Sequence, residues 1–405
     1  MTLLLLGAAA CATPAMTCED ELGCIAIGRR EPVRIGVMTA LSGEAAYLGR
    51  DIQRGIELAA ADRGSTLLDH QLQLVVTDSG CDEKVAAVAA KIVIEDEDVL
   101  AVVGPTCSVS AETAVPIIEA AGLSLISPAA SAARLTNPNK ATGGVWRPGF
   151  FRTAASDAYQ AELAANFAFD QLNARTAAII YDETDVNNSL HQIFADTFRQ
   201  RGGQITFQSS ISAGDSGVAD LLRVVGAATP DLLYLPLFEP EGNLIANYLP
   251  ESASLNDVIL LGSSGLFAPS FPIGASTPSL NDMYLVGPVQ GGAAYEAFLE
   301  HWQSRYNQPP SGLFHAQAYD AMNLLLNAIE TTAQVDNRGN LLIGLSALRQ
   351  ALAQTEGYAG VSGTLTCSPY GDCAAPDSLG VYQISREVIA GERWPPELVW
   401  RPGEE

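Results

Sequence analysis

The residues that could perform catalysis occur singly rather than in working sets. The segment 214–217 (GDSG) has the composition of a serine-nucleophile loop, but no histidine and aspartate stand in the supporting context that such a nucleophile requires. No HExxH pair occurs, and no glycine-rich GxGxxG or GxxxxGK loop opens a helix after a strand. We therefore expect no enzymatic activity, no cofactor and no metal site.

The cysteines indicate disulfide chemistry instead. The sequence has seven, and setting Cys11 apart leaves six, an even number that suits an oxidising compartment. A metal site is the alternative interpretation, but no CxxC or Cys/His spacing suits zinc. Short spacing, and then elimination, predict three disulfides, which are Cys18/Cys24, Cys367/Cys373 and Cys81/Cys107.

The first residues are typical of an export signal. The apolar run Leu3–Leu6 is followed by small residues and Cys11, as at the processing site of a bacterial lipoprotein. We expect residues 1–11 to be a signal peptide ending at a lipidated Cys11, and residues 12–32 to be a tether. Because Ala8 stands where such sites usually have leucine, an ordinary secretory signal is the alternative. Either signal predicts a periplasmic or cell-surface protein. With the lipoprotein signal, the protein would touch the membrane only through its lipid anchor.

The charge balance excludes two classes of partner. Acidic residues number 46 against 22 lysines and arginines, which gives a formal net charge of −24. Nucleic acid binding needs clustered basic residues, and docking on an anionic lipid surface needs them too. We therefore expect no nucleic acid partner and no basic membrane-binding surface.

Short apolar strands alternate with amphipathic helices along most of the chain, a pattern typical of parallel sheets buried on both faces. The alternation runs twice, with a glycine- and proline-rich pause near 140–156. We expect an α/β protein of two doubly wound parallel-sheet lobes joined by a hinge, with a ligand cleft at the carboxyl ends of the strands. The predicted strands are 33–38, 72–77, 99–103, 123–126, 177–181, 204–207, 231–235, 257–261 and 283–286. The predicted helices lie near 48–63, 84–95, 109–121, 157–174, 189–201, 217–228, 292–306, 315–332 and 341–354.

Two strand-to-helix turns have the residues of a binding site. In 104–112 (GPTCSVSAE), Ser108 stands where a helix N-cap is expected, and the free N–H groups of a helix start suit a carboxylate. The alternative is that Ser108 caps only its own helix. In 126–131 (ISPAAS), small side chains would let a ligand approach the backbone, and Ser131 adds a hydroxyl.

These turns belong to a set of motifs that resembles leucine/isoleucine/valine-type periplasmic binding proteins, which have the type I periplasmic binding fold and serve ABC importers. The resemblance covers roughly residues 33–385. The motifs that carry it are 35–37 (IGV), 41–43 (LSG), 78–82 (DSGCD), 103–108 (VGPTCS), 126–131 (ISPAAS), 151–153 (FRT), 318–321 (AYDA) and 360–365 (GVSGTL).

The resemblance implies roles for residues of the first lobe. Ser108 matches the serine that holds the ligand carboxylate, and Ala129 matches the residue whose carbonyl takes the ligand ammonium. Ser131 replaces a threonine that contacts the same head group. Phe314 falls where an aromatic residue lines the side-chain pocket, and Tyr47 stands one place before the family's tyrosine. Cys81 and Cys107 match a pair that is disulfide-bonded in some members.

The second lobe departs from the family pattern. The acidic residue that receives the ligand ammonium should lie within 262–265 (GSSG), but this chain has Ser264 there. Removing one partner of a buried charge pair costs about 2–5 kcal/mol. Unless Glu239 supplies the charge from a neighbouring loop, we expect weak binding of free amino acids. The carboxylate-binding half of the site is thus present, whereas the ammonium-binding half is altered.

We expect 33–153 with 288–355 to form the first lobe, and 154–287 with 356–395 to form the second. The predicted function is capture of a small polar ligand, an amino acid or a related carboxylate or amide, for an ABC permease and ATPase complex. One alternative is a sensor of the same fold that signals to a membrane partner. Another is a fold retained only for protein contacts.

Overall fold

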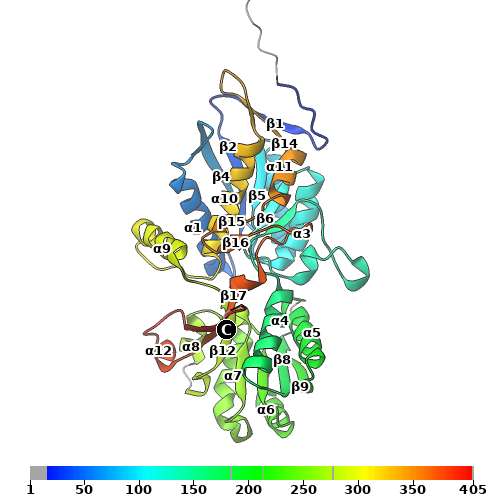
Figure 1. Cartoon of the computed structure of the whole chain (residues 1–405), viewed down its shortest axis with the longest axis vertical. Coiled ribbons are helices and arrows are strands. Elements are labelled where there is room, and N and C mark those ends of the chain that lie inside the picture. The colour runs from blue at the N-terminus through cyan, green and yellow to red at the C-terminus, as the bar shows by residue number, and fades with distance from the viewer. Residues whose placement is uncertain (1–15, 183–184, 213, 276–277, 404–405) are drawn as a thin grey trace, which may run out of the picture.

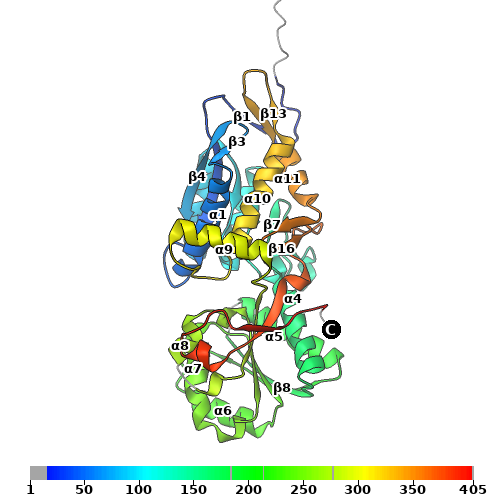
Figure 2. The same cartoon turned by 60° about the vertical axis from the view of Figure 1, so that its left-hand side comes forward.

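The computed structural model describes residues 16–182, 185–212, 214–275 and 278–403. Two α/β bodies are stacked along the long axis of the molecule, and we call them the first and second lobes (Figures 1 and 2). Each lobe is built on one sheet with helices on both faces. The predicted fold class is confirmed.

The first lobe is built on a six-stranded sheet in the order β3-β4-β2-β5-β6-β7, in which all pairs but β3/β4 are parallel. Helices α1 and α10 pack on one face, and α2 and α3 pack on the other. The strands are β2 (Val33–Thr39), β3 (Thr66–Leu67), β4 (His70–Asp78), β5 (Val99–Val103), β6 (Ser124–Ser127) and β7 (Phe150–Arg152), and the helices are α1 (Ala46–Asp62), α2 (Glu83–Glu95), α3 (Ser108–Ala120), α10 (His315–Thr332) and α11 (Leu345–Ala353).

The second lobe is built on a seven-stranded sheet in the order β18-β17-β12-β11-β10-β8-β9. Strands β8 to β12 are parallel, whereas β17 and β18 join antiparallel at one edge. The strands are β8 (Thr176–Asp182), β9 (Gln204–Ile211), β10 (Leu232–Leu235), β11 (Ile259–Gly262), β12 (Tyr284–Pro288), β17 (Leu379–Gln383) and β18 (Glu397–Trp400), and the helices are α4 (Asp157–Asn166), α5 (Asp185–Gln200), α6 (Val218–Ala227), α7 (Glu239–Tyr248) and α8 (Ser270–Ala275).

The chain passes between the lobes three times, and the third passage lies later than we expected. Residues 153–156 and 289–292 join the two sheets, and α9 (Ala293–Tyr306) then packs beside α1. The predicted second-lobe stretch 356–395 is divided, because the hairpin β15 (Tyr358–Gly360) and β16 (Gly363–Leu365) belongs to the first lobe. Leu365 and Cys373 are buried in the first-lobe core, so the chain enters the second sheet only at β17. That sheet continues to Trp400, beyond the predicted end.

The predicted tether is folded over much of its length. Strand β1 (Cys24–Ile27) pairs antiparallel with β14 (Leu341–Gly344), which also pairs with β13 (Gln334–Val335). Residues 341–344, predicted as the start of a helix, are therefore a strand. The Asp20 carboxylate accepts hydrogen bonds from the Ser346 and Ala347 N–H groups, both at 2.9 Å, and so caps α11. Side-chain capping and burial of Ile27 fix this segment to the first lobe.

All three predicted disulfides are present, joining Cys18 to Cys24, Cys81 to Cys107 and Cys367 to Cys373. The Cys81–Cys107 bond ties the loop after β4 to the residue before α3. Cys11 lies outside the described residues.

Candidate ligand-binding site

The turn between β5 and α3 has the form expected of a binding loop, but Ser108 is not the cap. Cys107 is the N-cap, and Ser108 is the first helical residue. The Ser108 side chain is buried, and its Oγ accepts a hydrogen bond from the Ala132 N–H at 3.1 Å. Gly104 has φ +123°, and a Cβ there would lie 2.0 Å from the Met38 carbonyl oxygen, so the turn requires glycine. Ser108 therefore sits in the first turn of α3, where N–H groups lack helical partners.

The loop after β6 is held beside Ser108 by buried polar groups. The Ser127 hydroxyl donates to the Pro105 carbonyl at 2.8 Å and accepts from the Ala130 N–H at 2.9 Å. Ala129 is buried and Ser131 is half-buried. The structure thus brings together Ser108, Ala129 and Ser131, the three residues that we predicted for the ligand head group.

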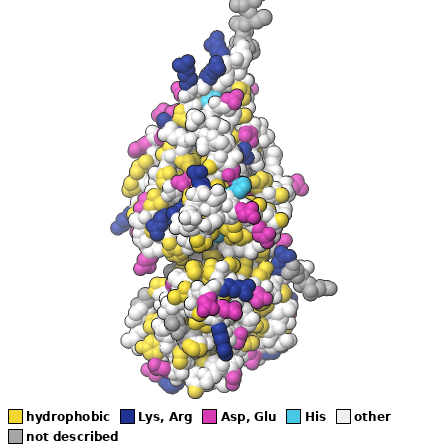
Figure 3. Space-filling model, turned by 90° about the vertical axis from the view of Figure 1, so that its left-hand side faces the viewer, with side chains coloured by type: hydrophobic (Ala, Val, Ile, Leu, Met, Phe, Trp, Pro, Cys, Tyr) yellow, Lys and Arg dark blue, Asp and Glu magenta, His cyan; other side chains and the backbone are white. Residues whose placement is uncertain are grey.

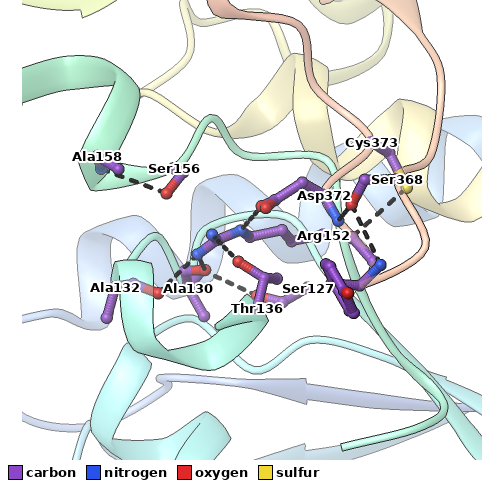
Figure 4. Close-up of polar contacts among 12 residues, drawn as sticks. Ser127, Ala130, Ala132, Thr136, Arg152, Ser156, Ala158, Ser368, Asp372 and Cys373 are labelled. Carbon is purple, nitrogen blue, oxygen red and sulfur yellow. Dashed lines mark hydrogen bonds and ion pairs between the residues drawn. The ribbon is translucent and has the colours of Figure 1, made fainter. Parts of the chain in front are cut away.

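The Arg152 guanidinium, at the end of β7, holds the same loop in place (Figure 4). It is fully buried and pairs with Asp372 at 2.5 Å. It also donates to the carbonyls of Ala130 and Ala132, at 3.2 and 2.8 Å, and to the Thr136 hydroxyl at 2.6 Å. A buried cation with this many acceptors fixes the position of the loop. It joins the loop to the Cys367–Cys373 segment, from which Asp372 comes.

Two residues at the start of α4 join the loops of the two lobes, and sequence reasoning missed both. The Asp157 N–H donates to the Ser131 carbonyl at 2.9 Å. The Gln160 amide donates to Asp157 Oδ1 at 3.3 Å, and Gln160 Oε1 accepts from the Ser264 N–H at 2.6 Å. The signal in the sequence was an acidic residue directly after the N-cap Ser156, at the end of the glycine-rich pause between the two alternating halves.

Asp157 is an unusual carboxyl group because it is 1% exposed. Burial raises the pKa of the Asp157 carboxyl to about 6, although the Arg152 charge and hydrogen bonds from Ser131 and Gln160 act in the opposite direction. Burial raises the pKa of the Tyr234 hydroxyl, on β10, well above the usual range, and the charge of Asp157 raises it further.

The remaining predicted residues come from α1, from α7 and from the residue before α10. Glu239 begins α7, and its Oε1 accepts a hydrogen bond from the Ser270 hydroxyl at 2.6 Å. Burial, together with the charges of Glu239 and Asp51, raises the pKa of the Tyr47 hydroxyl to about 12. The charge of Glu239, in the second lobe, thus acts on Tyr47 of the first lobe. Phe314 packs against the cores of both lobes, and hydrophobic side chains gather at the waist between the lobes in Figure 3.

Comparison with known proteins agrees with this geometry. A sequence model of the periplasmic binding protein family matches residues 32–384. The chain belongs to this family of solute-binding proteins, and it is not an enzyme. A relative from Pseudomonas aeruginosa, the leucine-, isoleucine-, valine-, threonine- and alanine-binding protein, is 24% identical over 76% of this chain and 80% of its own.

Solved structures show the same fold. LivJ of Streptococcus pneumoniae, a branched-chain amino acid transporter substrate-binding protein solved with isoleucine, is 23% identical with a TM-score of 0.76, over 92% of this chain and 100% of its own. A solute-binding protein of Rhodopseudomonas palustris solved with benzoate is 19% identical with a TM-score of 0.71, over 88% and 94% of the two chains. In the described part of our chain, no helix has the length and apolar character needed to cross a membrane.

Proposed function

We propose that this protein captures a small amino acid, or a related carboxylate or amide, between its lobes and delivers it to an ABC permease and ATPase complex. The observation that carries the proposal is the buried Ser108 in the first turn of α3, beside the loop 128–132. Helix N–H groups and the partial positive charge of a helix start stabilise a carboxylate. The P. aeruginosa relative supports an amino acid ligand, whereas the benzoate complex supports other carboxylates.

Delivery to an importer also requires export. We propose that residues 1–11 are a signal peptide and that Cys11 carries the lipid anchor, so that the protein works in the periplasm or at the cell surface. The three disulfides support an oxidising compartment. Mass spectrometry of the protein from its native membrane would identify the N-terminal residue and any lipid on it, and an unmodified Cys11 would contradict the anchor.

The first prediction concerns Ser108. We would refold the protein free of ligand and measure its thermal stability with branched-chain and other amino acids, small carboxylates, amides and aromatic acids. A ligand at a hundred times its Kd stabilises the folded state by about 2.7 kcal/mol, which raises Tm by a few degrees. Ser108→Ala should weaken the ligand found by about 10- to 100-fold, because hydrogen bonds to charged groups contribute about 1.5–3 kcal/mol.

Thr113→Ala is the matched control, since the Thr113 hydroxyl lies on the same helix and bonds to the Val109 carbonyl within it. It should leave affinity unchanged. An affinity that Ser108→Ala leaves intact would remove α3 from the site, and a panel without any binder would contradict the proposed function.

A further inference from the structure

We infer that Asp157, at the passage between the lobes, receives the positively charged group of the ligand in place of the acid that is missing at Ser264. The inference rests on the proposed function of the cleft and names the class of its ligand, a small molecule that carries an ammonium beside a carboxylate. Sequence reasoning had assigned this role to Glu239, on a different loop.

The position of Asp157 suits this role. Its carboxyl group is hydrogen-bonded by Ser131, the residue predicted to contact the ligand head group, and by Gln160. Gln160 Oε1 in turn accepts a hydrogen bond from the Ser264 N–H. Asp157 thus lies in a chain of contacts that runs from the first-lobe loop to the second-lobe loop. Glu239 instead accepts a hydrogen bond from the Ser270 hydroxyl.

The bonding of Asp157 is incomplete. Its second oxygen, Oδ2, is buried and has no hydrogen-bond partner among the described residues. The Ser263 hydroxyl and the Tyr234 hydroxyl are likewise buried without partners in the described part of the chain. Buried polar groups are normally satisfied, and a desolvated carboxyl is costly without a donor. The unpartnered Oδ2 of a desolvated carboxyl group, between the loops of the two lobes, indicates that a donor from outside the chain completes it.

The neighbouring cation does not fill this need. Arg152 is the basic residue that acts on Asp157, and its guanidinium is already directed to Asp372, to two carbonyls and to Thr136. An ammonium has three donors and a full charge, so it would satisfy Oδ2 and offset the buried negative charge. With the first turn of α3 for the carboxylate, the cleft then has acceptors and donors for both ends of an α-amino acid.

The test uses three probes that differ only in charge: L-leucine, 4-methylpentanoate, which lacks the ammonium, and 3-methylbutylamine, which lacks the carboxylate. Calorimetric titration of the refolded protein should show leucine binding at least about 30-fold tighter than 4-methylpentanoate. Asp157→Asn should weaken leucine by about 30-fold or more, because it removes the charged partner of a buried pair. The same variant should bind 4-methylpentanoate as well as the wild type does, or more tightly.

A pH series separates a charge effect from a structural one. The charged or titratable groups that act on Asp157 or respond to it are Arg152, with its partner Asp372, and Tyr234. Because burial raises the pKa of Asp157 to about 6, protons compete with the ligand below that pH. Wild-type affinity for leucine should fall about 10-fold between pH 7.5 and pH 5, and the affinity of Asp157→Asn should not.

Two further variants serve as controls. Glu162→Gln removes an exposed charge from the same helix and should change nothing. Ser264→Glu, added to Asp157→Asn, restores an acid at the family position and should recover leucine binding. If leucine gives no response, the amino acid with the largest thermal shift and its des-amino analogue take its place.

Unchanged leucine affinity in Asp157→Asn would overturn the inference. Equal wild-type affinity for leucine and 4-methylpentanoate, or binding of carboxylates alone, would also overturn it but would leave the solute-binding function intact. Binding of no probe and no member of the panel would contradict the proposed function itself.

Discussion

At the scale of single residues, Asp157 and Arg152 show how this protein tolerates buried charge. Arg152 has a full set of acceptors, as a buried cation requires, whereas Asp157 is left with an unused oxygen. A buried carboxyl group with an unpartnered oxygen lowers the free energy of unfolding. Functional sites commonly keep a destabilising group of this kind, because the bound ligand then satisfies it. Arg152 and Asp157 are only five positions apart in the sequence. The difference in their hydrogen bonding therefore arises from the residues that surround each side chain in the folded protein.

The cost at Asp157 gives a prediction about pH and stability. A folded-state pKa of about 6, raised from the ordinary 3.8, means that the folded protein holds a proton that the unfolded chain has lost. Stability should therefore fall as pH rises from about 4 to 6. Asp157→Asn should be more stable than the unliganded wild type at pH 7.5 by about 1–3 kcal/mol, and equally stable near pH 4. Urea unfolding at the two pH values measures this, and a variant that is less stable at pH 7.5 would contradict the prediction.

At the scale of elements, covalent and polar clips hold the segments that carry the site. Asp320, on α10, accepts the N–H groups of Val361 and Ser362, at 2.9 and 2.8 Å, and so fixes the β15–β16 hairpin to the first lobe. Gly360 lies against the same carboxylate, where a Cβ would be 2.4 Å from it. This clip explains why residues 356–374 remain with the first lobe until β17 begins.

The disulfides should differ in their effect on stability. Loop-closure entropy predicts about 3.5 kcal/mol for Cys81–Cys107, which joins residues 26 apart, and about 2 kcal/mol for Cys367–Cys373, which joins residues 6 apart. The two double variants to serine, compared by urea unfolding with the wild type, measure the difference. A larger loss from removal of the shorter loop would mean that Cys367–Cys373 acts through the folded state, through the loop that supplies Asp372.

Helix α7 shows what pattern alone misses at this scale. The predicted helices did not include 239–248, a segment that contains Pro240 and Gly242. Proline in the first turn has no N–H that the helix needs, and Gly242 allows the close approach of Leu266. Both residues are therefore compatible with a helix once its neighbours are in place.

At the scale of the whole molecule, three passages of the chain join the two lobes. Phe314 packs against the cores of both lobes. Hinge closure on a ligand is the expected motion for two lobes joined in this way.

Small-angle scattering tests that motion. A compact chain of 405 residues has a radius of gyration of about 22 Å, and the ligand-free protein should exceed this value because its two lobes are stacked end to end. The radius should fall when the ligand found in the panel is added at saturation. An unchanged radius, with binding proved by calorimetry, would show that the cleft binds without closing.

The sequence by itself determined the class of fold, the disulfide pairs and the first-lobe half of the candidate site. Short apolar strands separated by amphipathic helices predict parallel sheets from local sequence alone. Strand-to-helix turns are also marked by neighbouring residues, such as glycine, proline and serine. The turns around Ser108 and 127–131 were readable for that reason, although the cap was misplaced by one residue.

Only the tertiary structure decided what stands opposite those turns. Asp157 is far in sequence from Ser264 and Tyr234, and its unused oxygen follows from burial at the meeting point of two sheets. Tertiary packing also determines the positions of β1, β14 and the third passage between the lobes. Ile27, Leu341 and Leu365 are all buried in the first-lobe core, and this burial keeps their segments in the first lobe. Burial and hydrogen-bond satisfaction depend on distant parts of the chain, and a local pattern does not record them.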